Sequence, residues 1–226
     1  MTPPRPCPHP AELLHLARPG LEAGDADRVA RDVGGVFTAG SLLGLLGRRL
    51  TPGERCVVAL TLGLLGRGPR VEEALCGLLH DASAGVAAAA EHAVWTFWLR
   101  GNGGAGGGAF QLGLEAVGAG ETAAARRHFE EAAWRDPGLA EAHHQLGLLA
   151  AAQGRLGAAA AGFAAAVAAN PLHFGALAGA GHAALRLGRV GEAEALYTRA
   201  LALHPGLAGV GETLAALRAA RTRRAG

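Results

Sequence analysis

Apolar residues recur at helical spacing along most of the chain. In residues 71–81, VEEALCGLLHD, the side chains of Leu75, Leu78 and Leu79 follow the three- and four-residue steps of one helix face. Residues 55–66 and 85–98 carry similar apolar runs. Only 4% of the residues are aromatic and isoleucine is absent, whereas alanine, leucine and arginine, which favour helices, are abundant. The pattern therefore predicts an all-α protein.

The C-terminal half repeats itself every 34 residues. Three X-Pro steps end at Pro137, Pro171 and Pro205, and counting back 31 residues places the repeat starts at residues 106, 140 and 174. The same kinds of residue then occupy the same columns of each copy, which indicates three equivalent units. These columns are Gly113, Gly147 and Gly181 at position eight; Gly120, Gly154 and Gly188 at fifteen; Ala125, Ala159 and Ala193 at twenty; Phe129, Phe163 and Tyr197 at twenty-four; and Ala132, Ala166 and Ala200 at twenty-seven.

Each column has a physical cause in a helical hairpin. Glycine at eight and alanine at twenty let the two helices cross closely, and the aromatic ring fills space between successive hairpins. Glycine at fifteen can take the left-handed conformation that ends the first helix, and proline at thirty-two stops the second. This pattern resembles the tetratricopeptide repeat over residues 106–207. The resemblance implies a helical-hairpin solenoid, which we place at residues 109–222 as three repeats and a C-terminal capping helix.

The sequence after the last repeat predicts that capping helix. Leu207, Val210, Leu214 and Leu217 keep near-helical spacing, and a repeat array needs a helix with a polar outer face over its last hairpin. Arginines crowd the end of this segment. We interpret them as solvated residues with favourable helix-dipole contacts, and binding to anionic lipid or RNA is the alternative.

The resemblance also implies a binding surface. In tetratricopeptide arrays the first helices line a concave groove through repeat positions two, five, nine, twelve and thirteen. Relatives that grip acidic chain ends use several polar and cationic groups there, whereas this sequence offers Arg186 as the one cation. We therefore expect a protein or peptide partner that is an amphipathic helix or an extended apolar segment, and the alternative is that these positions only face solvent. The groove residues carried onto this sequence are Phe110, Leu114, Glu141, His144, Leu148, His182, Leu185 and Arg186.

The second repeat is expected to be the least stable of the three. Its second helix, GAAAAGFAAAVAAN, consists almost entirely of alanine and glycine. Alanine buries little apolar area, and Gly162 inside a helix costs about 1 kcal/mol relative to alanine. We predict that this repeat depends on its neighbours for stability.

The N-terminal half follows a different pattern. An ALTLGLLG helix precedes an EEALCGLL helix, and this order resembles the short HEAT repeat, with a further half-repeat at 85–98. We therefore assign residues 21–100 to HEAT-like helices, including a helix over Asp25 to Val36. Residues 1–20, which contain six prolines, are predicted to be disordered.

A glycine-rich segment separates the two halves. Residues 101–108, GNGGAGGG, have the composition of a flexible linker. We favour a hinge between two solenoids, and a loop at a continuous junction is the alternative. The aromatic residues Trp95, Phe97 and Trp98 precede it, and we expect them to pack at the junction instead of forming an exposed binding patch.

No residue pattern predicts catalysis, a cofactor or a metal. There is no nucleophile elbow, P-loop or HExxH motif. His143 and His144 would point about 100° apart on a helix. His144 and His182 could approach each other, but this half of the chain has no cysteine to complete a zinc site. We therefore predict a non-catalytic interaction scaffold. The alternative is a lyase-like modification enzyme or its subunit, whose polar candidates on the HEAT-like half are Arg55, Glu72, Glu73, His80, Asp81, Glu91 and His92.

The net charge and the N-terminal residues bear on the kind of partner and on the location of the protein. The net charge of +2 argues against a nucleic-acid partner, so RNA binding is only a third interpretation. All basic residues are arginine, as the coding bias of a GC-rich genome produces, and we expect a bacterial protein. The N-terminus lacks the apolar run of an export signal, and the apolar stretch at 33–47 is shorter than the ~20 residues of a membrane span. We expect a cytoplasmic protein.

Overall fold

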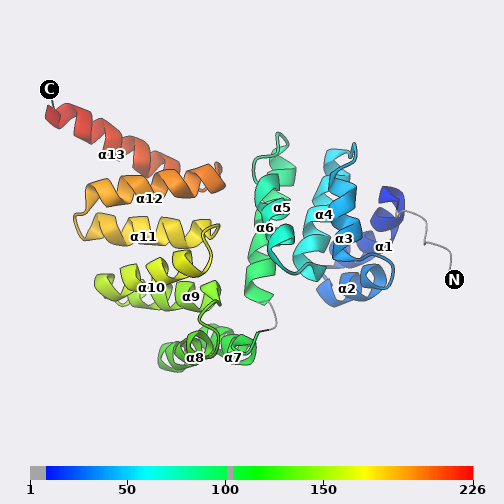
Figure 1. Ribbon diagram of the computed structural model, residues 1–226, viewed down its shortest axis with the longest axis horizontal. Helices are drawn as coiled ribbons and strands as arrows, with labels where there is room; N and C mark the ends of the chain where they lie inside the picture. The colour runs from blue at the N-terminus through cyan, green and yellow to red at the C-terminus, as the bar shows by residue number, and fades with distance from the viewer. Residues whose placement is uncertain (1–8, 101–103, 226) are drawn as a thin grey trace. The chain divides into compact units, whose positions relative to one another are not determined.

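The helices of this protein fall into two compact units. The computed structural model describes residues 9–100 and 104–225, and within these ranges it contains thirteen α-helices and no strand (Figure 1). Unit 1 covers residues 1–102 and unit 2 covers residues 103–226, so the boundary lies in the glycine-rich segment. The all-α prediction is confirmed for the described residues.

The described residues of unit 1 form six helices, and the first begins earlier than the sequence predicted. His9 caps it by accepting a hydrogen bond from the backbone N–H of Ala11, and Pro10 stands at the first helical position, where a missing N–H costs nothing. The prediction of disorder is therefore wrong for residues 10–20, and residues 1–8 lie outside the described part. The helices are α1 (Pro10–Ala23), α2 (Ala26–Gly34), α3 (Ala39–Leu46), α4 (Pro52–Leu65), α5 (Pro69–Leu78) and α6 (Ala84–Arg100).

The centre of unit 1 is the crossing of α4 and α6. These two helices contact each other far more extensively than α4 contacts α5. A Cβ atom at Gly63 would lie 2.7 Å from the carbonyl oxygen of Ala93, so glycine permits this close approach. Leu62 and Val94 are fully buried beside it. The main partner of α4 is therefore α6 and not α5, with which the sequence pattern paired it. The HEAT-like assignment of these helices stays a prediction.

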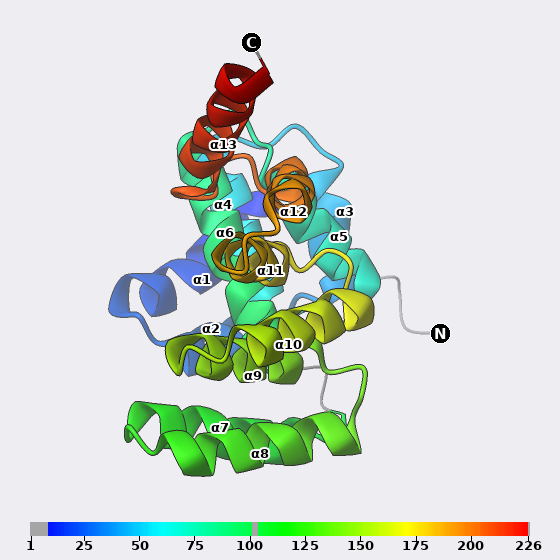
Figure 2. The ribbon, with the colours of Figure 1, turned by 90° about the vertical axis from the view of Figure 1, so that its left-hand side faces the viewer.

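Unit 2 is a stack of helical hairpins. Each odd-numbered helix from α7 to α11 pairs with the next helix, and the pairs contact one another through α8 with α9 and α10 with α11 (Figure 2). A last helix packs on α12. The helices are α7 (Gly107–Gly118), α8 (Thr122–Arg135), α9 (Ala140–Ala152), α10 (Leu156–Ala169), α11 (Phe174–Arg186), α12 (Val190–Leu203) and α13 (Val210–Ala225).

The 34-residue period appears directly in the backbone. Gly120, Gly154 and Gly188 follow the first helices of the three hairpins with φ angles of 75°, 72° and 76°, the left-handed region that glycine adopts without strain. The second helices end just before the predicted X-Pro steps, at residues 135, 169 and 203. The predicted linker over residues 101–108 ends earlier than expected, because Gly107 and Gly108 already belong to α7.

The position-eight glycines lie where the two helices of each hairpin cross, and each faces an aromatic ring of the second helix. A Cβ atom at Gly113 would lie 2.4 Å from the ring of Phe129, and the two later repeats place the same column against Phe163 and Tyr197. The aromatic residue therefore lies against the first helix of its own hairpin. Phe163 also packs against Ala180 and Ala183 of the next hairpin, as the sequence predicted. In repeat two, a Cβ atom at Gly162 would also lie 2.8 Å from the Cα of Gly147, so the two backbones touch there.

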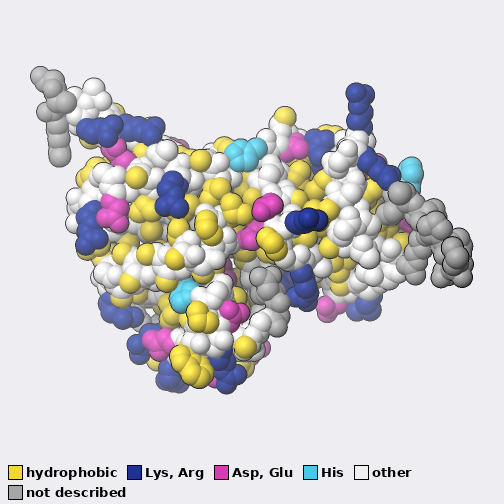
Figure 3. Space-filling model, in the orientation of Figure 1, with side chains coloured by type: hydrophobic (Ala, Val, Ile, Leu, Met, Phe, Trp, Pro, Cys, Tyr) yellow, Lys and Arg dark blue, Asp and Glu magenta, His cyan; other side chains and the backbone are white. Residues whose placement is uncertain are grey.

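The C-terminal helix covers the last hairpin. Val210 and Leu214 of α13 are buried in one cluster with Leu177, Tyr197 and Ala200. Arg218, Arg221 and Arg223 of α13 contribute to the basic region at its C-terminal end (Figure 3). Arg221 forms an ion pair with the mostly buried Glu194 of α12. The helix thus has the apolar inner side and the polar outer side that a cap requires.

Among residues 9–100 and 104–225, no single helix is long and apolar enough to cross a membrane. Helices α2 and α3 reach the length and apolar composition of a span only when they are taken together, and the pair is bent by 90°.

Candidate functional site

The eight predicted groove residues divide into a buried set and an exposed set. Phe110, Glu141 and His144 are 0%, 2% and 5% exposed, so neighbouring helices cover them and they offer almost no surface to a partner. The other five retain accessible surface: Leu148, His182 and Arg186 are exposed, and Leu114 and Leu185 are partly buried. Of the eight predicted residues, only this second set can therefore contact a partner.

Two exposed apolar residues near the predicted set were left out of it. Val117 on α7 is 44% exposed, and Leu187 at the end of α11 is 37% exposed. Leu148 on α9 is 43% exposed. Val117 occupies position twelve of its repeat, one of the groove positions, so the repeat pattern alone could have identified it. Large apolar side chains therefore remain accessible on each of the three first helices or at its end.

His182 is held in one orientation by a buried phenol. The hydroxyl group of Tyr197, whose side chain is fully buried, lies 2.7 Å from Nδ1 of His182. Burial raises the pKa of Tyr197 and lowers the pKa of His182, so at neutral pH the phenol donates and the imidazole accepts. The neutral His182 ring then carries its hydrogen on Nε2.

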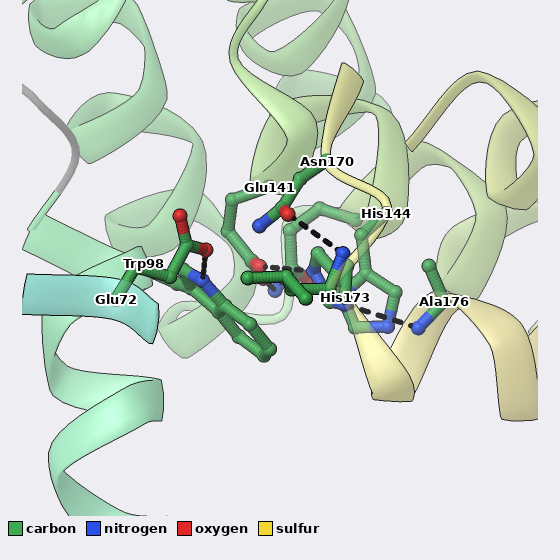
Figure 4. A network of polar contacts seen from close by, with 9 residues as sticks. Glu72, Trp98, Glu141, His144, Asn170, His173 and Ala176 are labelled. Atoms are coloured by element: carbon green, nitrogen blue, oxygen red, sulfur yellow. Dashed lines mark hydrogen bonds and ion pairs between the residues drawn. The ribbon is translucent and has the colours of Figure 1, made fainter. Parts of the chain in front are cut away.

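A buried polar network joins repeats two and three (Figure 4). Glu141 of α9 accepts hydrogen bonds at Oε1 from Nδ1 of His144 at 3.1 Å and from Nε2 of Gln145 at 2.9 Å. Its Oε2 lies 2.8 Å from Nε2 of His173, which precedes α11 and is 1% exposed. Nδ1 of His173 in turn accepts the backbone N–H of Ala176 at 3.1 Å. The network therefore connects the start of α9 to the start of α11.

The backbone contact fixes where the proton sits on His173. A neutral imidazole has one N–H and one lone pair. Since Nδ1 uses its lone pair to cap α11, the hydrogen must be on Nε2, from which it is donated to Glu141. This arrangement requires Glu141 to be ionised and His173 to be neutral.

The pKa directions agree with this assignment. Burial by itself would raise the pKa of Glu141, but the hydrogen bonds from His144 and His173 outweigh it and hold the pKa well below its ordinary value. Burial lowers the pKa of His173, although Glu141 acts in the opposite direction. Both groups therefore keep these charge states at neutral pH.

The network has ligand types that zinc accepts, but its proton positions do not suit a metal. One ligand atom from each of Glu141, His144 and His173 lies within 4.8 Å of the other two. Ligation through Nε2 of His173 would need a lone pair at the atom that carries the hydrogen. It would also require His173 to release the N–H of Ala176. The geometry therefore favours a hydrogen-bonded network over a metal centre.

Several of the polar residues named as candidates for catalysis in unit 1 form contacts that join its helices. Nε of Arg55 lies 2.8 Å from Oδ2 of Asp81, and Asp81 also accepts the backbone N–H of Ser83 before α6. Glu72 accepts a hydrogen bond from the indole N–H of Trp98, whose side chain is mostly buried. These contacts connect α4 and α5 to the start and end of α6.

Comparison with known proteins places the repeats in a family. Residues 110–171 and 144–208 match the model of the tetratricopeptide repeat. The chain therefore contains tetratricopeptide repeats across these residues, as the sequence pattern predicted, while the HEAT-like assignment of residues 21–100 stays a prediction. No curated protein matches the chain significantly.

The similar solved structures have low sequence identity to this chain. The first tetratricopeptide repeat domain of Spaghetti, bound to an HSP90 peptide, is 21% identical, covers 50% of this chain and 93% of its own, and has a TM-score of 0.47. MamA is 19% identical, with coverages of 83% and 94% and a TM-score of 0.42. A thermophilic tetratricopeptide repeat protein from Thermus thermophilus is 19% identical, with coverages of 92% and 98% and a TM-score of 0.39.

Proposed function

We propose that this protein is a non-catalytic scaffold whose repeats hold a peptide or helix of another protein against α7, α9 and α11. The observation that carries the proposal is the exposure of Leu148, a large apolar residue at position nine of the middle repeat. Val117 and Leu185 extend the accessible apolar surface to the two neighbouring repeats. Tetratricopeptide repeats over residues 110–208 support a role in protein binding. We further propose that the protein is bacterial and acts in the cytoplasm.

The chemistry of this surface favours a mainly apolar partner. Arg186 is the one cation in the predicted set, so the surface has too few positive charges to bind the carboxylates of an acidic chain end. The Nε2–H of His182 offers one oriented hydrogen-bond donor, which suits a backbone carbonyl group of an extended segment. An amphipathic helix that presents leucine-like residues would bury the same apolar surface. The partner expected here is therefore an apolar segment with few charges.

The test uses peptides selected by the full-length protein from a random library displayed on phage. We expect the selected peptides to be apolar or amphipathic. The double variant Leu148→Arg and His182→Glu should weaken their binding at least about tenfold, which corresponds to about 1.4 kcal/mol. Isothermal titration calorimetry gives the dissociation constants, and circular dichroism verifies that the helices are retained.

Leu112→Arg provides the matched control. Leu112 is 49% exposed on α7, and its position two residues from Leu114 places it on nearly the opposite side of the helix. This substitution should leave peptide binding unchanged. Full binding by the double variant would show that the partner uses another surface.

A further inference from the structure

The buried network at the junction of repeats two and three contains His173, whose neutral form fits its hydrogen-bond partners and whose protonated form does not. His173 lies in the turn between α10 and α11, and both of its ring nitrogens are occupied. In the neutral form, Nε2 donates to Glu141 and Nδ1 accepts from the N–H of Ala176. Addition of a proton to Nδ1 would turn this atom into a donor that faces another donor. The hydrogen bond that caps α11 cannot survive this change.

Among the helices of unit 2 that pack around His173, α9 supplies the titratable groups that face it. From α9, the titratable groups that face His173 are Glu141 and His144, and the imidazole rings of His144 and His173 lie 4.5 Å apart between centroids. The helix α10 carries no ionisable residue, and in α11 the first ionisable residue is His182, more than two turns from the cap. The carboxylate of Glu141 already faces Nε2, so it cannot also accept a proton placed on Nδ1.

We infer that His173, held against Glu141 and His144, forms an acid-sensitive lock at the junction of repeats two and three, in which protonation of His173 breaks the hydrogen bond that caps the start of α11. The lock does not depend on which molecule the repeats bind. It is also confined to this junction, because the residues that correspond to His173 in the other repeats are Leu139 and Leu207.

The sign of the pH dependence follows from burial. Burial lowers the pKa of His173 in the folded chain below the value of about 6.5 that it has when exposed. The open or unfolded state therefore binds a proton first as the pH falls. The stabilising contribution of the lock is complete above about pH 6.5 and is lost progressively below it. In that range the opening equilibrium constant should rise by up to about tenfold per pH unit from this one proton.

The first measurement uses the full-length wild-type protein labelled with ¹⁵N. Long-range histidine spectra at pH 7.5 should show His173 neutral, with its hydrogen on Nε2 and none on Nδ1. The amide protection factor of Ala176 should then fall by up to about tenfold per unit between pH 6.5 and pH 5. A hydrogen on Nδ1, or a protection factor that does not change over this range, would overturn the inference.

A variant tests whether His173 is the group responsible. In His173→Asn, the amide oxygen can still accept the N–H of Ala176, but the side chain cannot titrate. The pH-dependent loss of protection at Ala176 should disappear. The control His143→Asn alters a neighbouring, only partly buried histidine and should retain it. An unchanged pH profile in His173→Asn would assign the effect to another group.

Added Zn²⁺ distinguishes the lock from a metal centre. With one equivalent of Zn²⁺ at pH 7.5, we expect no change in the signals of His173 and no rise in the midpoint of thermal unfolding. A stabilisation that is absent from His173→Asn would show that the metal displaces the proton, and it would contradict the lock.

Discussion

At the scale of single residues, the repeats depend on glycines that leave room for a neighbour. Gly113, Gly147 and Gly181 each face the aromatic ring of their own hairpin. The recurrence of these columns and their place at the helix crossing could be read from the sequence. The aromatic partner of each glycine could not, because spacing shows which residues recur and not which of them touch. Gly162 gives a second example: helix propensity marks it as a weakness, whereas the fold uses it for backbone contact with Gly147.

Replacement by alanine should therefore change the stability in opposite directions at two glycines of α10, Gly162 and Gly157. On helix propensity alone, Gly162→Ala would stabilise the chain by about 1 kcal/mol. The added methyl group would collide with the backbone of α9, and overpacking of this kind costs about 1–3 kcal/mol. We therefore expect a lower midpoint of thermal unfolding for this variant.

Gly157→Ala is the matched control on the same helix. A Cβ atom there meets nothing within 4 Å, so alanine should be neutral or stabilise by up to about 1 kcal/mol. Equal stability of the two variants, measured by thermal unfolding, would contradict the close contact between α9 and α10.

At the scale of helices, local capping explains where several elements begin. Thr51 and Glu54 form a reciprocal capping box at the start of α4, and this pattern can be recognised in the sequence. His173 at the start of α11 was not recognised as a cap. A signal was available, because His173 stands in a column that holds leucine in the other two repeats. Its partner Glu141 gives the same kind of signal, because glycine occupies position two in both other repeats.

The terminal helix α13 should stabilise the array through its buried leucine. Leu214 is 5% exposed and lies in the cluster formed with Tyr197. Leu214→Ala should lower the free energy of unfolding by about 2–5 kcal/mol, because it removes buried methyl groups and leaves a cavity. Urea unfolding measures the change.

The exposed residue Ala216 on the same helix provides the comparison. Ala216→Gln should alter the free energy of unfolding by no more than about 0.5 kcal/mol. If Leu214→Ala were as stable as this control, α13 would not act as a cap.

At the scale of the whole molecule, the sequence predicted unit 2 better than unit 1. The period of 34 residues located three hairpins, because glycine and proline mark the ends of helices through their backbone conformations. The spacing of apolar residues after Pro205 located the cap. Unit 1 lacks such a period, and its main crossing of α4 with α6 joins segments that are not adjacent in the chain. Burial was the hardest feature to predict, since Glu141 and His144 are polar and yet lie inside the stack.

The first helices of the three repeats form the proposed binding surface. Amide hydrogen exchange of the full-length protein, with and without a peptide selected from the random library, locates the bound segment directly. We predict increased protection at the ends of α7, α9 and α11 around Val117, Leu148 and Leu185. Protection confined to α8, α10 and α12, or to unit 1, would contradict it.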